Sequence, residues 1–294
     1  MVTPPREHLP ALRVAILDAF TSEAYRGNPA AVILSTSPLN LDDRRNLAIE
    51  LNQPATAFVS HPAFRGATGS NASFAAAAAP RPVISWHTSS GDALPLCGHA
   101  TMAASAYLLD EWAPDLDEIR IEIALPAAPA RAVPVRDDRA RDDILSALTA
   151  ATGIARGSVE DVSANVTIRV SREVDLGRLD VDPSEFLAVP YRGIYLTNLS
   201  PPGSASHFRS RVFFPSIGIL EDHVCGSAHT RLGPYWIEHC EGTTAPLPPI
   251  VEVDQVSPRG GKFALTWDAK WGDERGLVRL RGRAKLIMEG HLRV

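Results

Sequence analysis

The sequence predicts a mixed α/β fold built of two similar halves, and three observations lead to this prediction. Short apolar segments of strand length alternate with amphipathic segments of helix length, which is typical of α/β proteins. Residues 126–134 include three prolines and are the best candidate for a domain boundary. A Cys-Gly pair before an apolar helical segment occurs twice. We therefore expect an N-terminal lobe over residues 1–126 and a C-terminal lobe over residues 127–294, with a last strand that can cross back to the first lobe.

In the first half, apolar runs between turn residues predict strands and one spaced pattern predicts a helix before Pro54. Leu47, Ile49 and Leu51 supply the apolar side of that helix. The predicted strands are 13–20, 30–34, 56–60, 83–87 and 120–125, and the predicted helices are 42–52 and 99–109. Residues 65–82 are rich in Gly, Ser and Ala, a composition that predicts an excursion of the chain on the protein surface, without helix or strand.

In the second half, strands are predicted over 165–171, 193–198 and 210–214, followed by a helix over 228–239. Residues 250–294 read as strands joined by turns at Arg259-Gly260-Gly261, Gly272 and Gly282.

The bulk composition indicates a globular protein that binds neither nucleic acid nor a membrane. The 294 residues are 45% apolar and 21% charged, and the net charge is only −5. No apolar run approaches the roughly 18 residues of a membrane span, and the polar, Pro-rich residues 1–10 lack the apolar run that is typical of a signal peptide. Three cysteines, Cys97, Cys225 and Cys240, are too few for a disulfide scaffold. We expect reduced thiols and a cytoplasmic location.

The repeated Cys-Gly pair is the most informative feature. Leu96-Cys97-Gly98-His99-Ala100-Thr101 and Val224-Cys225-Gly226-Ser227-Ala228-His229 each precede an apolar helical segment, and the two cysteines are 128 positions apart (225 − 97). The first N–H groups of a helix lack internal partners and favour an anion. A thiol at such a position is expected to have a lowered pKa. Two facing helix starts would hold an anionic substrate between two groups that exchange a proton.

Four ordered blocks resemble the signatures of PhzF-like phenazine-biosynthesis proteins. They are Asp18-Ala19-Phe20-Thr21, Gly27-Asn28-Pro29-Ala30-Ala31-Val32, Cys97-Gly98-His99-Ala100-Thr101, and the segment from Glu221 to His229. The resemblance implies the diaminopimelate-epimerase type of fold, in which two pseudo-symmetric lobes each wrap a sheet around a central helix. It also implies an active site in the cleft, no metal or organic cofactor, a small acidic substrate isomerised by moving a proton, and a homodimer.

Carried over residue by residue, the family's histidine falls on His99, its aspartate on Asp222 and its serine on Ser227. Its glutamate, the general acid/base, falls on Ala55. A second acidic position falls on Ala93, with Asp92 displaced by one. Cys97 and Cys225 occupy the places of the two catalytic cysteines of diaminopimelate epimerase, although many PhzF-like proteins lack one or both.

These observations define the candidate site and three candidate functions. The catalytic candidates are His99, Asp222, Cys97 and Cys225, and the substrate-binding candidates are Asn28, Gly98, Gly226, Ser227 and Ala55. The first function is a cofactor-independent isomerase or epimerase acting on a small anionic metabolite. The alternatives are a cyclase or pericyclase-type enzyme of secondary metabolism that positions and polarises its substrate, and a binding protein without catalysis. Deuterium uptake from solvent into a substrate C–H bond separates the first from the others.

Overall fold

The computed structural model describes residues 12–64, 81–112, 137–163, 166–240, 246–268 and 277–293. The chain divides into two compact units. Unit 1 comprises the described residues of Met1–Ala24, Pro29–Leu125 and Arg283–Val294, and unit 2 those of Tyr25–Asn28 and Pro126–Gly282. The expected strand at 120–125, most of the expected excursion at 65–82 and the proline-rich 126–134 lie outside the described residues. Of the helices in the described ranges, none has the length and apolar character needed to cross a membrane.

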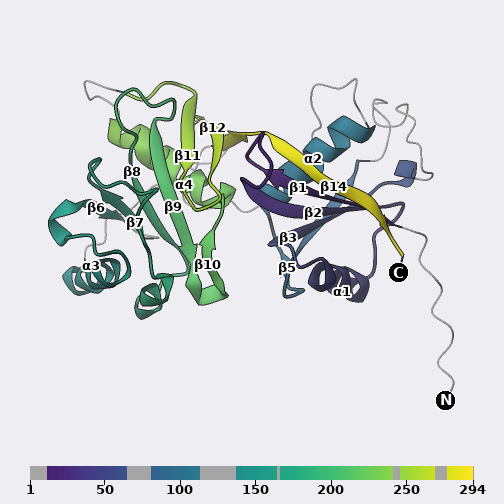
Figure 1. Ribbon diagram of the computed structural model, residues 1–294, viewed down its shortest axis with the longest axis horizontal. Coiled ribbons are helices and arrows are strands. Elements are labelled where there is room, and N and C mark those ends of the chain that lie inside the picture. Colours follow the sequence, from purple (N-terminus) through teal and green to yellow (C-terminus); the bar gives the residue numbers. More distant parts are fainter. Residues whose placement is uncertain are drawn as a thin grey trace, which may run out of the picture. The chain divides into compact units, whose positions relative to one another are not determined.

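Unit 1 is built on a sheet with the strand order β14-β1-β2-β3-β4-β5. Its strands are β1 (Leu12–Ala19), β2 (Asn28–Ser35), β3 (Ala55–Ser60), β4 (Val83–Thr88), β5 (Ala93–Leu94) and β14 (Ala284–Leu292). The C-terminal β14 pairs antiparallel with β1, so the two ends of the described chain share one sheet (Figure 1). β2 and β3 are parallel, and β3 and β4 are antiparallel.

The helix α1 (Leu41–Leu51) packs on one face of this sheet. Asn40 caps its start by accepting from the Asp43 N–H at 2.8 Å, and Asn52 ends it in the left-handed conformation. Leu47 and Ala48 are buried against Leu12, Val14, Ile33 and Phe58. The prediction that Ile49 faces inward is wrong, because its side chain is 44% exposed. Each helical residue turns by 100°, so a helix that buries positions 47 and 48 points position 49 away.

The helix α2 (Gly98–Trp112) packs against β1 and β3. It buries small and aromatic side chains, namely Ala100, Ala103, Ala104, Tyr107 and Leu108. Arg13 of β1 donates to the Tyr107 hydroxyl at 3.1 Å. Because side chains alternate along a strand, Arg13 lies on the opposite face from Leu12 and Val14, and α2 therefore covers the face that α1 does not.

Unit 2 contains a larger sheet with the order β13-β12-β11-β9-β8-β7-β6, and β10 pairs with β9. The strands are β6 (Val159–Ser163), β7 (Thr167–Val170), β8 (Ile194–Leu199), β9 (Phe208–Phe214), β10 (Ile219–Asp222), β11 (Val251–Gln255), β12 (Gly261–Asp268) and β13 (Leu277–Arg281). β7–β8 and β9–β11 are parallel pairs, and the other pairs are antiparallel. Strands and helices in both units confirm the predicted mixed α/β class.

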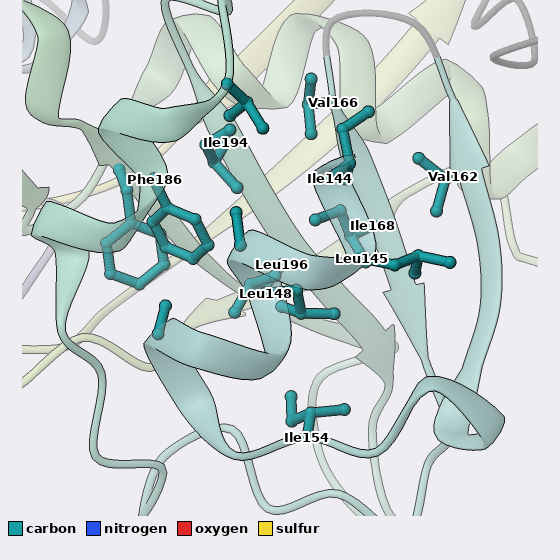
Figure 2. Close-up of a cluster of buried hydrophobic side chains, with 14 of the residues drawn as sticks. Ile144, Leu145, Leu148, Ile154, Val162, Val166, Ile168, Phe186, Ile194 and Leu196 are labelled. Carbon is teal, nitrogen blue, oxygen red and sulfur yellow. The ribbon is translucent and has the colours of Figure 1, made fainter. Parts of the chain in front are cut away.

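One face of this sheet carries the helix α3 (Asp138–Thr152), which the sequence analysis missed. Asp137 caps its start, and Gly153 ends it with a φ of 70°. Ile144, Leu145, Leu148 and Ala151 follow a helical spacing and join the core with strand residues that include Val162, Ile168, Ile194 and Leu196 (Figure 2). The charged start of the helix, residues 137–143, conceals this pattern in the sequence.

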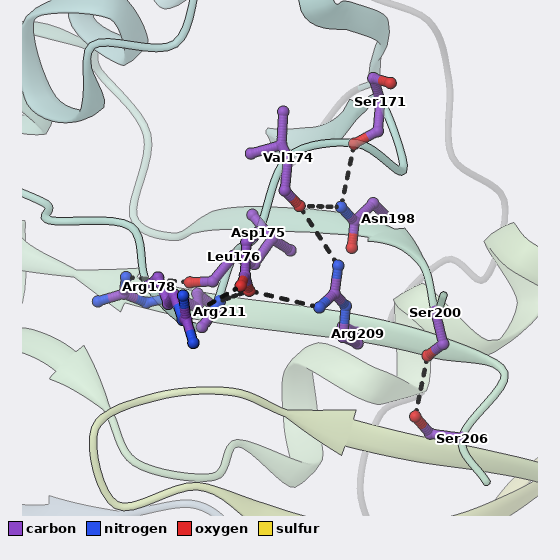
Figure 3. Close-up of polar contacts among 11 residues, drawn as sticks. Ser171, Val174, Asp175, Leu176, Arg178, Asn198, Ser200, Ser206, Arg209 and Arg211 are labelled. Atoms are coloured by element: carbon purple, nitrogen blue, oxygen red, sulfur yellow. Dashed lines mark hydrogen bonds and ion pairs between the residues drawn. The ribbon is translucent and has the colours of Figure 1, made fainter. Parts of the chain in front are cut away.

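The segment after β7 is fastened to β8 and β9 by polar side chains (Figure 3). Asn198 donates to the carbonyls of Ser171 and Val174, and Arg209 donates to the same Val174 carbonyl. Arg211 donates to the carbonyls of Leu176 and Leu179. Arg209 and Arg211 are two residues apart in β9, so both side chains lie on the same face of the strand. Both bind carbonyl groups of the segment that follows β7.

The helix α4 (Gly226–Cys240) covers the other face. The Trp236 indole N–H donates to the Thr197 hydroxyl at 2.8 Å. His229 is fully buried between the Ser210 hydroxyl at 2.9 Å and the Cys225 carbonyl at 2.7 Å. Burial lowers the pKa of His229 to about 4, so the ring is neutral near pH 7.

Candidate functional site

The segment Asp222–Cys225 joins β10 to α4, and side chains from distant parts of the chain hold its backbone. Gln255 accepts from the Cys225 N–H at 2.8 Å and donates to the Asp222 carbonyl. Ser257 donates to the His223 carbonyl, and Asn28 donates to the Val224 carbonyl at 3.0 Å. Each residue of the segment thus has a backbone group bound by a side chain from elsewhere in unit 2. Such bonds fix the segment before any ligand arrives.

The Asn28 amide is oriented by its neighbours. Its nitrogen donates both to the Asp222 carboxylate at 2.7 Å and to the Val224 carbonyl. Because the Asp222 carboxylate and the Val224 carbonyl are both acceptors, the amide nitrogen of Asn28, and not its oxygen, must face them. The amide oxygen is buried and has no hydrogen-bond partner among the described residues. A buried acceptor without a partner is unfavourable, so this oxygen is suited to accept a hydrogen bond from a ligand.

Asp222 is placed by the strand that ends with it. Glu221, the residue before it, forms a two-pronged ion pair with Arg211 at 2.8 and 2.7 Å. Alternation along the strand sends Asp222 to the opposite face, where it is the partner of Val212 in β9. Burial raises the pKa of Asp222 to about 6, although hydrogen bonds from Cys225, Val224 and Asn28 act to lower it. A partly exposed carboxyl with this pKa can take up or release a proton near neutral pH.

The thiol of Cys225 does not have the lowered pKa expected from its place at a helix start. Burial and the neighbouring Asp222 carboxylate raise its pKa well above the usual value, and the hydrogen bond to Ser227 offsets only part of this rise. Its sulfur lies 3.3 Å from the Ser227 hydroxyl. The prediction is wrong for this cysteine, because the lost hydration and the nearby negative charge outweigh the helix dipole. Cys225 is therefore a neutral S–H donor, and Asp222 is the group that ionises.

Tyr195 of β8 lies in the same row of the sheet as Asp222. Tyr195 pairs with Val212, and Val212 pairs with Asp222, so all three side chains point to the α4 face. Burial raises the pKa of Tyr195 to about 12, with a further rise from Cys225 and opposing effects from Arg231 and Arg192. The phenol thus lies within electrostatic range of the thiol and of Arg231.

In unit 1, Cys97 and His99 meet at the start of α2. The Cys97 sulfur lies 3.4 Å from His99 Nδ1 and 3.9 Å from Nε2. Thr101 donates from both its N–H and its hydroxyl to the Cys97 carbonyl. Cys97 is buried, whereas Gly98 and His99 are partly exposed. The pair offers a thiol and an imidazole, which can pass a proton between them.

Ala55, which stands where the resemblance expects a glutamate, begins β3 with none of its surface exposed. Its cross-strand partner is Thr88. The Thr88 hydroxyl lies 2.7 Å from that of Ser90, which donates to the Asp92 carboxylate at 2.7 Å. Ala93, at the second expected acidic position, is exposed in β5. Neither alanine can carry a proton, and the neighbouring acid is Asp92.

The structure thus brings the predicted site residues together in two groups. Asn28, Asp222, Cys225, Gly226 and Ser227 lie together in unit 2. Cys97, Gly98 and His99 lie together in unit 1, which also contains Ala55. Among the described residues, no cluster of three or more His, Cys, Asp and Glu side chains is arranged to hold a metal ion.

Sequence reasoning missed four residues of the unit 2 group: Tyr195, Arg231, Gln255 and Ser257. Arg231 follows Ser227 by four positions on a predicted helix, and that spacing was an available signal. The other three lie on strands or turns whose register no local pattern reveals.

The comparisons with known proteins agree with this fold. The family model described as "Phenazine biosynthesis-like protein" (PhzC-PhzF) matches residues 17–122 and 113–290. A human phenazine biosynthesis-like domain-containing protein is 30% identical over 314 aligned residues, covering 96% of this chain and 99% of the relative. A protein of Halalkalibacterium halodurans named as an uncharacterised isomerase is 31% identical and covers 76% of this chain and 82% of the relative.

Among solved structures, a PhzF-family protein of Enterococcus faecalis matches with a TM-score of 0.71 and 25% identity, covering 97% of this chain and all of the other. A putative PhzC/PhzF protein of Clostridium difficile matches with the same TM-score at 23% identity and the same coverage, which supports the fold alone. The family model and the curated relatives both extend over nearly the whole chain. The chain therefore belongs to the PhzC-PhzF family of phenazine biosynthesis-like proteins.

Proposed function

We propose that this protein is a cofactor-independent isomerase or epimerase that moves a proton on a small anionic metabolite, with Asp222 as the proton-transferring group. The observation that carries the proposal is a partly exposed carboxyl whose pKa is raised to about 6 and whose surroundings are fixed. A general base works best when its pKa lies near the operating pH. The name of the Halalkalibacterium halodurans relative supports the same class of reaction.

The proposed step uses the residues around Asp222 in distinct roles. The Asp222 carboxylate takes a proton from a C–H bond next to an activating group, and the new carboxylic acid returns the proton to another carbon or to the other face. Asn28 holds one carboxylate oxygen, and its amide oxygen, which has no partner in the described ranges, accepts a hydrogen bond from the substrate. Cys225 donates its S–H to Asp222 and acts as a hydrogen-bond donor, not as a thiolate base.

His99 and Cys97, which lie in unit 1, stay catalytic candidates from the sequence. An epimerisation needs a donor on the face opposite the base, whereas a 1,3-isomerisation can use one group twice. Within unit 1, the imidazole lies 3.4 Å from the Cys97 sulfur through Nδ1, so these two side chains can exchange a proton with each other. A joint role of the two Cys-Gly helix starts stays a prediction from the sequence.

One observation favours a second candidate function. Ala55 stands where the resemblance places a glutamate, and its buried methyl group cannot transfer a proton. An enzyme that only positions and polarises a reactive substrate, as for a cyclisation, does not need that glutamate. The fixed amide and hydroxyl groups around Asp222 would suit such a reaction as well.

The experiment that separates these functions is solvent deuterium exchange. The purified protein is incubated in D2O with a panel of small carboxylates that carry an acidic C–H bond, and deuterium uptake is measured by mass spectrometry and proton NMR. We expect one deuterium to enter at that carbon at a rate that depends on Asp222.

Turnover without deuterium uptake would replace the isomerase by the cyclase-type enzyme. Saturable binding across the panel with neither turnover nor exchange would make the protein a binding protein. The Asp222→Asn variant serves as the matched control, because it keeps the shape of the side chain and removes its charge.

A further inference from the structure

Arg231 of α4 is a cation that the proposed proton transfer does not yet use. It is partly buried, and its guanidinium has no ion pair or hydrogen bond within the described part of the chain. A partly buried charge loses hydration, and that loss is normally compensated by a counter-charge. Other arginines of unit 2 have such partners, for example Arg211 with Glu221 and Arg209 with Asp175. Arg231 thus has no counter-charge among the described residues and can bind an anion.

The position of Arg231 in α4 places it on the same side of the helix as Ser227. It follows Ser227 by four residues, so both side chains lie on the same side of the first turns of α4. Ser227 itself lies 3.3 Å, oxygen to sulfur, from Cys225. The first N–H groups of a helix add a positive potential at the same end.

A second, independent observation points to a ligand at this end of α4. Tyr195 is only 7% exposed, and no hydrogen bond of its hydroxyl falls within the described residues. A tyrosine hydroxyl without a partner can donate a hydrogen bond to a ligand that reaches it. The ring is held by Phe214 with centroids 6.0 Å apart, and a Cβ added at Gly193 would lie 2.9 Å from Tyr195 Cε1. The absent side chain at position 193 therefore lets the ring occupy this place.

Tyr195 and Asp222 lie on the same face of the sheet, on the two strands next to β9. They sit two strands apart on either side of Val212, which corresponds to about 10 Å between backbones, with both side chains on the α4 face. A small molecule that reaches both groups would have one end at Tyr195 and Arg231 and the other at Asp222.

We propose that Arg231 and the Tyr195 hydroxyl form an anion subsite that binds the carboxylate of the substrate and directs its acidic C–H bond to Asp222. The subsite rests on the proposed function, which already takes a small anionic substrate, and adds the residues that would hold its carboxylate. When Asp222 removes a proton next to a carboxylate, negative charge builds up on the two carboxylate oxygens. The guanidinium and the phenol donate hydrogen bonds to those oxygens and stabilise the charge. The proton moves to Asp222 and later returns to carbon, and no redox partner takes part.

The test measures binding without turnover. Malonate and inorganic phosphate are titrated into the protein by calorimetry at low ionic strength. We expect Arg231→Gln to raise the Kd for malonate at least about tenfold, since a charge-assisted pair is lost. Tyr195→Phe, which removes only the hydroxyl, is expected to raise it by about threefold, since one hydrogen bond is lost.

The matched control is Arg178→Gln, which removes the same charge from an exposed arginine of unit 2 paired with Asp175. It is expected to leave the Kd for malonate unchanged. If Arg231→Gln should fold poorly, Arg231→Lys keeps the charge, loses the two-pronged geometry and is expected to bind malonate with intermediate affinity. Equal malonate affinity in the wild type and in Arg231→Gln, or no binding of malonate and phosphate by the wild type, would overturn the subsite.

Asp222→Asn distinguishes this inference from the proposed function. The variant removes a negative charge near the subsite, so malonate should bind at least as tightly as in the wild type, while deuterium exchange is lost. If exchange persists in Asp222→Asn but malonate binding still depends on Arg231, the assignment of the base fails and the subsite stands.

Discussion

The two Cys-Gly helix starts have similar sequences and different surroundings. In unit 1, Cys97 contacts His99 and Thr101 of its own helix. In unit 2, the segment before the helix is held by Asn28, Gln255 and Ser257, and Cys225 lies beside the Asp222 carboxyl. The comparison teaches that a shared helix-start motif does not define the protonation state of its thiol. Neighbours from other elements decide which group ionises.

The difference also separates two chemical roles. The unit 1 start offers an imidazole and a thiol, both uncharged donors or acceptors when the histidine is neutral. The unit 2 start offers a carboxyl with a pKa of about 6 next to a thiol that stays protonated. We therefore expect substitutions in unit 2 to affect proton transfer more strongly than equivalent substitutions in unit 1.

The largest expected effect is on exchange activity. Asp222→Asn should lower the rate of deuterium exchange by about 10²- to 10⁴-fold, the usual contribution of a general base. His99→Gln should lower it by about tenfold or less, since glutamine keeps a hydrogen-bonding group at that position. Initial exchange rates of both variants with one substrate measure the contrast. Equal losses of exchange rate in the two variants would contradict the proposal that unit 2 contributes more to proton transfer than unit 1.

The stability of Asp222→Asn provides an internal check on that result. A folded-state pKa raised from 3.8 to about 6 means that Asp222 favours folding in its protonated form. Its contribution is therefore fully present below pH 4 and is lost as the pH rises through 6. Asp222→Asn should be more stable than the wild type by about 1 to 3 kcal/mol at pH 7 and equally stable near pH 3. Urea unfolding at the two pH values measures the difference.

The next largest effect concerns the anchoring of the two helix starts. Gln255→Leu leaves the buried Cys225 N–H and the Asp222 carbonyl without their side-chain partner, at an expected cost of about 2 to 3 kcal/mol. Thr101→Val removes one of two bonds to the Cys97 carbonyl and should cost about 0.5 to 1 kcal/mol. Chemical unfolding compares the two variants. A smaller loss for Gln255→Leu than for Thr101→Val would contradict the difference in anchoring.

The reactivities of the Cys225 and Cys97 thiols provide a further comparison of the two helix starts. Because the Asp222 carboxylate raises the pKa of Cys225, Asp222→Asn should increase the rate of Cys225 alkylation at pH 8 several-fold. The rate at Cys97, in the other unit, serves as the control and should stay unchanged. Iodoacetamide labelling with peptide mass spectrometry resolves the cysteines. A parallel change at Cys97 would point to a general opening of the protein.

The smallest expected effect is a shift of the pH profile. Asn28 lowers the pKa of Asp222 by donating to its carboxylate, so Asn28→Ala should raise that pKa. The base form is populated above the pKa, and the acidic limb of the exchange rate should therefore move to higher pH by about half a unit to one unit. Initial exchange rates between pH 4.5 and 8 measure the position of this acidic limb. An acidic limb at the same pH in both proteins would mean that a group other than Asp222 controls it.

Much of the fold could be predicted from the sequence. Apolar runs placed β1, β8 and the other central strands, and the helical spacing placed α1, α2 and α4 within a few residues. The missed α3 shows the limit, because its charged first turns hide the apolar positions that its cap and Gly153 delimit. Local periodicity indicates an element only where the apolar face dominates its composition.

The site was predictable only in part, for a physical reason. The mixed α/β class, the two Cys-Gly helix starts and the family blocks could be recognised in the sequence, because each depends on residues close together in the chain. The raised pKa values of Asp222 and Cys225, and the position of Tyr195 near both of them and near Arg231, became visible only in the folded protein. A pKa is set by burial and by neighbouring charges, and folding brings those neighbours from positions as distant as Asn28 and Gln255.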